Sequence, residues 1–175
     1  MHIAVQIFSM KTISGYRIIS YILLPIAGIF GLMCLLMLII SLGNPATLIP
    51  VLIMCAVVVY IITSFIFLIK GIDQLKKCKP SLRSLIKTTA YISLFFIISI
   101  LFQGITLLYK PSLLNSFIDQ TIATQKNMTG VTPEFMLSVV KGILYFMIFF
   151  ATTLLIHVFE TFKFLKLYAG LFEKE

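Results

Sequence analysis

The chain has too little charge to be a water-soluble domain. Only 11% of its residues are charged and 60% are hydrophobic, whereas about 25% of the residues in an ordinary soluble domain are charged. A globule of 175 residues with this composition could not cover its surface with polar groups. The composition therefore predicts an integral membrane protein whose main surroundings are the lipid bilayer.

Residues that could hold a metal or carry out catalysis are also scarce. The three cysteines, Cys34, Cys55 and Cys78, lack the spacing of a zinc site. No HExxH, GxSxG or P-loop motif occurs, and no apolar run carries a pair of carboxylates for acid–base chemistry. We therefore expect a protein that is not an enzyme, with no cofactor and no metal.

The longest stretch without charge organises the chain. Between Arg17 and Lys70 no side chain is charged, and as one helix this stretch would be roughly 78 Å long, against a hydrocarbon core of ~30 Å. It must therefore fold back once. Gly43, Asn44 and Pro45 provide the turn, since Asn44 can cap the second helix and Pro45 fits its first position.

Two further apolar runs complete a predicted four-helix transmembrane bundle. The spans are expected at about residues 18–42, 48–69, 88–109 and 142–162. In the connecting segment 110–141, apolar residues recur at helical spacing: Leu113, Leu114, Phe117, Ile118 and Ile122. They predict a short amphipathic helix that lies at the interface or caps the bundle. The fold class is all-α, a polytopic membrane protein with one membrane domain over residues 1–175.

Positive charges are distributed unequally between the ends of these spans. Of the 14 lysines and arginines, only Lys110, Lys126 and Lys141 fall on the side of the 110–141 segment. The positive-inside rule places the other side, with both termini, in the cytoplasm. The net charge of +8 then follows from topology and indicates no nucleic-acid partner. The small size and the Ile- and Lys-rich composition favour a bacterial cytoplasmic membrane.

Segment 70–87 is the strongest polar feature of the chain. It contains one acid, Asp73, and six basic residues: Lys70, Lys76, Lys77, Lys79, Arg83 and Lys87. Helical pattern continues on both sides of Lys79-Pro80, so we expect a helical hairpin that turns there. Its charge has two interpretations. Each cation gains about 1 kcal/mol near an anionic leaflet, and the same face could dock an acidic cytoplasmic protein.

Polar side chains predict a layer in the cytoplasmic third of the bundle. Thr63, Ser64, Ser93 and His157 lie roughly 8–9 Å from the ends of their spans, at ~1.5 Å per residue. An ionisable residue in a span suggests a proton relay or a ligand site. Alternatively, His157 is a neutral imidazole that bonds to Ser93 or a threonine and holds helices together. Glu160 is expected to pair with Lys163.

The residues from Ile66 to Ile72 and from Leu75 to Lys87 carry a resemblance to a known family. This stretch resembles an uncharacterised family of small bacterial four-span membrane proteins, in which a basic loop with a central proline joins the second and third spans. Its members are often encoded near small helix-turn-helix regulators. The resemblance implies a membrane-embedded accessory or regulatory protein and no particular site residues.

These observations lead to two expectations about function. The first is a non-enzymatic accessory or regulatory membrane protein that binds a protein partner or anionic lipid through its basic hairpin. The second is a small transporter or channel subunit, with Gln103, Thr152, Thr153 and His157 along a path. One bundle of this size encloses little space, so the second expectation requires a homo-oligomer or a larger partner.

Overall fold

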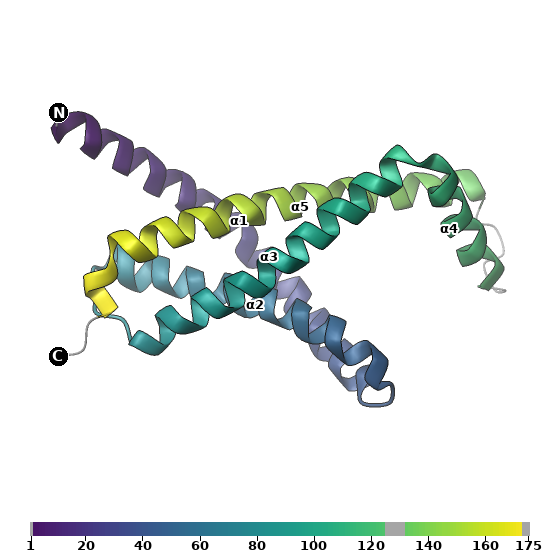
Figure 1. The fold of residues 1–175 in the computed structure, drawn as a ribbon, viewed down its shortest axis with the longest axis horizontal. Coiled ribbons are helices and arrows are strands. Elements are labelled where there is room, and N and C mark those ends of the chain that lie inside the picture. Colours follow the sequence, from purple (N-terminus) through teal and green to yellow (C-terminus); the bar gives the residue numbers. More distant parts are fainter. Residues whose placement is uncertain (1, 125–131, 173–175) are drawn as a thin grey trace. The chain divides into compact units, whose positions relative to one another are not determined.

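The computed structural model describes residues 2–124 and 132–172, and every regular element within them is helical. Five α-helices follow one another: α1 (His2–Ser41), α2 (Leu48–Phe67), α3 (Pro80–Tyr109), α4 (Pro111–Thr124) and α5 (Pro133–Leu167) (Figure 1). Three short elements connect or end them: η1 (Pro45–Thr47), the π-helical η2 (Leu68–Asp73) and η3 (Ala169–Phe172). The predicted all-α fold is confirmed.

Four helices are long and apolar enough to cross a membrane. They are Ile13–Ser41, Leu48–Asp73, Pro80–Tyr109 and Pro133–Leu167, and each overlaps one predicted span. Large apolar side chains point outward along them, as Ile29, Leu32 and Ile39 do on α1. In water such a surface would be costly, whereas hydrocarbon covers it without penalty. The chain is therefore built as a multi-pass membrane protein in contact with the bilayer.

The chain forms two compact units, and α3 and α5 each contribute to both. Unit 1 comprises the residues up to Phe96 together with those from Leu154 onward. Unit 2 comprises Ile97–Thr153. Each unit is described separately below.

In unit 1, α1 and α2 form the predicted antiparallel hairpin. The turn lies where it was predicted, but it leads first into η1: Asn44 Oδ1 accepts a hydrogen bond from the Ala46 N–H at 3.3 Å, and Pro45 begins η1. The second helix itself begins at Leu48 with Thr47 as its N-cap, so the expected cap by Asn44 and first position of Pro45 apply to η1 and not to α2. The helices approach closely at Gly31, where an added Cβ would lie 3.4 Å from Val58 Cγ1. At the open end of the hairpin, Arg17 Nη2 lies 2.6 Å from Asp73 Oδ1.

The connection between α2 and α3 differs from the prediction. Helical structure ends at Asp73, not at Lys79, and resumes at Pro80. The chain leaves the helix at Leu75, which has a left-handed φ of 51°, while the Lys76 N–H bonds to the Lys70 carbonyl at 3.0 Å. Residues 74–79 therefore form an irregular connection. The prediction was wrong because it used the local hydrophobic pattern, whereas the backbone group that hydrogen-bonds to this connection lies far away in the sequence.

In unit 2, the predicted amphipathic helix is confirmed as α4. Leu114 and Ile118 are buried, whereas Leu113 and Phe117 are about half exposed. The following helix, α5, begins as expected, because Thr132 Oγ1 accepts a hydrogen bond from the Phe135 N–H at 3.3 Å. Residues 125–131 of the predicted 110–141 segment, including Lys126, lie outside the described residues.

Candidate functional site

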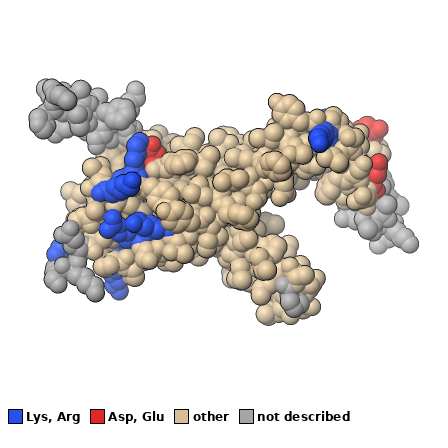
Figure 2. All heavy atoms as spheres, viewed as in Figure 1, with Lys and Arg blue, Asp and Glu red and all other residues tan. Residues whose placement is uncertain are grey.

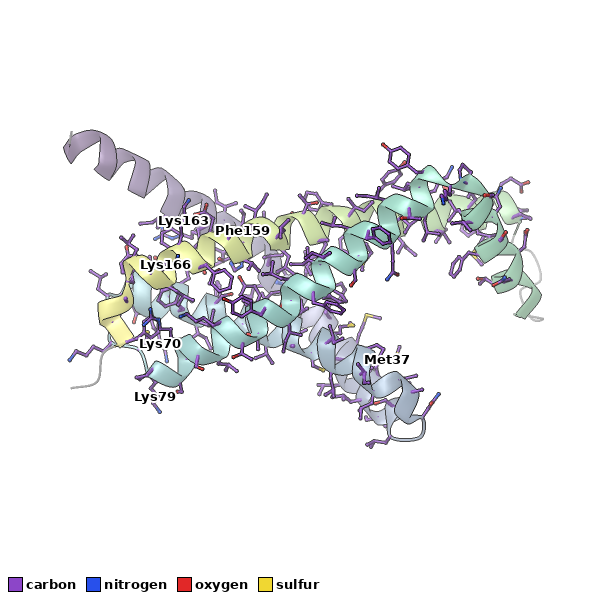
Figure 3. All side chains as sticks on the ribbon, in the orientation of Figure 1. Met37, Lys70, Lys79, Phe159, Lys163 and Lys166 are labelled. Carbon is purple, nitrogen blue, oxygen red and sulfur yellow. The ribbon has the colours of Figure 1, made fainter. Side chains whose placement is uncertain are left out.

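The six basic residues predicted as a binding face lie together on unit 1. Lys70 is on η2, Lys76, Lys77 and Lys79 are in the 74–79 connection, and Arg83 and Lys87 are near the start of α3. Two lysines of α5 join them at the same end, and Figure 3 shows Lys163 and Lys166 there with Lys70 and Lys79. We call these eight residues the basic face. Figure 2 shows blue lysine and arginine side chains gathered at this end of the molecule.

Two acids near the basic face are each paired with a cation. Asp73 binds Arg17 of α1, which lies outside the basic face, at 2.6 Å. Glu160 binds Lys163 of the basic face at 3.0 Å, and the predicted i,i+3 pair is thereby confirmed. The Asp73 pair also ties the start of the first candidate span to the end of the second.

A cavity of about 500 Å³ opens within the basic face. Its polar lining consists of Ser81 and three lysines, Lys70, Lys77 and Lys79. Ile66, Leu82 and Leu85 line its apolar part, and Cys78 completes the wall. The walls of one cavity thus combine cationic and apolar side chains, and its volume is within the size range of small-molecule sites.

The C-terminal segment holds the irregular connection in place. The Cys78 N–H donates to the Leu171 carbonyl at 2.8 Å, which is a backbone bond between the connection and η3. The Phe172 ring lies 5.3 Å from the Phe67 ring, and the Arg83 guanidinium carbon lies 5.8 Å from the Phe172 centroid. Arg83 therefore also has a packing role, in addition to its contribution to the basic face.

Cys78 is buried in this arrangement, and its surroundings control its acidity. Burial raises the pKa of the Cys78 thiol, and the positive charge of Lys70 offsets that rise only in part. The thiol therefore stays protonated at neutral pH, and because the thiolate is the nucleophile, Cys78 is poorly suited to nucleophilic chemistry. It serves as a wall of the cavity.

A second polar cluster surrounds His157 in the interior of unit 1. His157 Nε2 lies 2.9 Å from Ser20 Oγ, and His157 Nδ1 lies 2.9 Å from Tyr60 Oη. Thr161 Oγ1 is 2.9 Å from Tyr60 Oη and 3.2 Å from Tyr16 Oη. The Tyr16 ring stacks on the imidazole at a centroid distance of 4.8 Å. All five side chains are fully buried, and they come from α1, α2 and α5.

Both ring nitrogens of His157 have a partner on another helix. Nε2 pairs with Ser20 Oγ of α1, and Nδ1 pairs with Tyr60 Oη of α2. Both ring nitrogens are satisfied without a carboxylate. The cluster is suited to holding α1, α2 and α5 together.

The other residues of the predicted polar layer are placed differently. Thr63, Ser64 and Ser93 are buried, but each hydroxyl donates to a carbonyl of its own helix. The partners of His157 are thus Ser20 and Tyr60, where the sequence suggested Ser93 or a threonine. Sequence reasoning overlooked Tyr16 and Ser20, although these two, like His157 and Thr161, are four residues apart and so share a helix face.

The residues named for a transport path are divided between the two units, with His157 in unit 1 and the other three in unit 2. Thr152 and Thr153 belong to unit 2, and their hydroxyls donate to carbonyls of α5 itself. Gln103 is exposed on the unit 2 part of α3. Across the described ranges, no three His, Cys, Asp or Glu side chains gather as metal ligands.

No protein-family model, curated protein or solved structure matches this chain. The four long apolar helices agree with the small four-span membrane protein that the sequence resemblance implied. The resemblance itself identifies no family.

Proposed function

We propose that this chain is a non-enzymatic accessory or regulatory protein of the membrane that binds an anionic partner through its basic face. The partner is an acidic protein or anionic lipid at the surface of the bilayer. The observation that supports the proposal most strongly is the convergence of cations from η2, the 74–79 connection, α3 and α5 at one end of unit 1. If these cations only fixed the orientation of the spans in the membrane, they would not need to line a shared cavity.

The proposal includes an orientation. The basic face lies in the cytoplasm of a bacterial cell, and both termini lie on that side. The support is the positive-inside rule, because the cytoplasmic ends of spans carry an excess of lysine and arginine. An anionic leaflet attracts the same residues by about 1 kcal/mol each.

The test compares two sets of charge reversals in the full-length protein purified in mild detergent. The first set is Lys76→Glu, Lys77→Glu and Lys87→Glu, three exposed positions of the basic face. Arg83 is left intact because its guanidinium packs over Phe172. The control is Lys110→Glu with Lys141→Glu, two exposed positions in unit 2.

We expect the molecules that co-purify with the unaltered chain to be recovered at least about tenfold less with the first set. Mass spectrometry of proteins and lipids in the eluate measures this, and the unit 2 control should match the unaltered chain. Equal recovery with both sets would refute the proposal.

A further inference from the structure

We propose that the cavity in the basic face is a binding site for one anionic phospholipid. Its phosphate lies among Lys70, Lys77 and Lys79, and the upper part of one acyl chain follows Ile66, Leu82 and Leu85. The inference rests on the proposed function and names the ligand class for the same face.

The chemistry of the walls points to an amphiphile. Three ammonium groups and the Ser81 hydroxyl can donate hydrogen bonds to phosphate oxygens, and each such contact is charge-assisted. The three apolar side chains on the other part of the wall offer nothing to an anion. They suit a hydrocarbon chain joined to that anion.

The position of the cavity in the chain points to a lipid. Ile66 and Lys70 lie in the candidate span Leu48–Asp73, and Leu82 and Leu85 lie in the candidate span Pro80–Tyr109. Lys77, Cys78 and Lys79 lie between these two spans, outside both. The cavity therefore lies at the ends of two candidate spans, where acyl chains meet headgroups, and Lys77 and Lys79 lie beyond those ends.

Electrostatics at the site favours a negative headgroup. Asp73, the acid of segment 70–87, is held by Arg17 on α1. The cavity also lies at the beginning of α3, where the helix dipole adds positive potential over its first turn. A zwitterionic headgroup would bring its own cation toward these lysines and gain less.

Size separates a lipid from the other anionic ligands. A volume of about 500 Å³ is far larger than a phosphate ion, which would leave the apolar part empty. An acidic protein approaching from water would meet the exposed Lys76 and Lys87 as readily as the lysines inside the cavity. The cavity therefore discriminates in favour of a ligand that enters from the bilayer.

The experiment is a lipid titration of the delipidated full-length protein in detergent, followed by native mass spectrometry. The probes are phosphatidylglycerol, phosphatidylcholine and water-soluble glycerol phosphate. The test variant is Lys70→Ala with Lys79→Ala, and its matched control is Lys76→Ala with Lys87→Ala. The control removes two lysines of the same face that do not line the cavity.

We expect phosphatidylglycerol to bind the unaltered chain at one saturable site, ahead of both other probes. The test variant should weaken that binding by about fivefold per lysine, and the control by less than about twofold. Leu85→Trp, which extends into the apolar part, should weaken phosphatidylglycerol binding while all lysines remain. Equal losses in the test and control variants would show diffuse attraction and overturn the inference, as would equal binding of phosphatidylcholine or glycerol phosphate.

These outcomes separate the two proposals. If the cavity variants bind lipid normally while Lys76→Glu, Lys77→Glu and Lys87→Glu abolish partner recovery, the lipid site is wrong and the basic face remains a binding surface. If the charge reversals leave recovery of every partner unchanged, the proposed function fails, whatever the cavity binds in detergent.

Discussion

At the residue scale, two buried serines have different physical roles. Ser20 Oγ is the hydrogen-bond partner of His157 Nε2, so Ser20→Ala leaves a buried ring nitrogen without a partner. Ser93 Oγ donates only locally, to the Thr89 carbonyl. We expect Ser20→Ala to lower the free energy of unfolding by about 1 kcal/mol and Ser93→Ala by less than about half of that.

Denaturant titration in detergent micelles measures both serine variants. Each substitution removes one hydroxyl group from a buried position. The difference between the two variants therefore measures the hydrogen bond between helices that Ser20 makes. Equal losses for Ser20→Ala and Ser93→Ala would contradict the assignment of His157 as a link between α1, α2 and α5.

Cys78 provides a pH-dependent prediction. Because burial raises the pKa of its thiol, the reactive thiolate forms at higher pH than in an exposed cysteine. In a chain with Cys34→Ala and Cys55→Ala, alkylation of Cys78 by iodoacetamide should be slow at pH 7 and should accelerate above pH ~9. A rate profile with its midpoint below pH 8 would show that the thiol is exposed or activated.

The sequence indicates which residues are buried better than it indicates which residues bond. Thr63, Ser64, Ser93 and His157 are all in the interior, as their positions in apolar runs suggest. Their partners could not be deduced, because a hydroxyl in a helix can bond its own backbone or another helix, and the choice depends on packing. Tyr16 was overlooked because it precedes the predicted first span.

At the element scale, η2 is shaped by a glycine. A Cβ added at Gly71 would lie 2.7 Å and 2.8 Å from two atoms of the Phe67 ring, which is fully buried and packs on Phe172. We expect Gly71→Ala to lower the free energy of unfolding by about 1–3 kcal/mol. Gly28→Ala is the control, because nothing lies within 4 Å of its added Cβ. Its thermal midpoint should stay equal or rise, and matching losses at the two sites would contradict this packing.

Elements whose signals lie in neighbouring residues could be predicted from the sequence. The 74–79 connection, which is held by a contact distant in the sequence, could not. The Thr132 cap, the Asn44 turn and α4 follow from residues within a few positions of each other. The 74–79 connection takes its shape from Leu75 in a left-handed conformation and from the bond between Cys78 and Leu171. No periodicity in the local sequence encodes a partner almost a hundred residues away.

At the scale of the whole molecule, solvent determines the arrangement. Four helices have compositions suited to hydrocarbon, and of the described lysines and arginines all but Lys110 and Lys141 belong to unit 1. Of the residues that line the cavity, Lys77 and Lys79 lie between two candidate spans, whereas Lys70 and the two leucines lie within the ends of those spans. The proposed function and the proposed lipid site both depend on this position of the cations at the ends of the candidate spans.

The position of the basic face relative to the membrane is the central claim, and side-specific labelling tests it directly. Lys76→Cys is placed in a chain whose native cysteines are replaced by alanine, and intact bacterial cells are treated with a membrane-impermeant maleimide. Residue 76 should label only after the membrane is opened, whereas Lys110→Cys, in the position between α3 and α4, should label in intact cells. Labelling of residue 76 in intact cells would contradict the account.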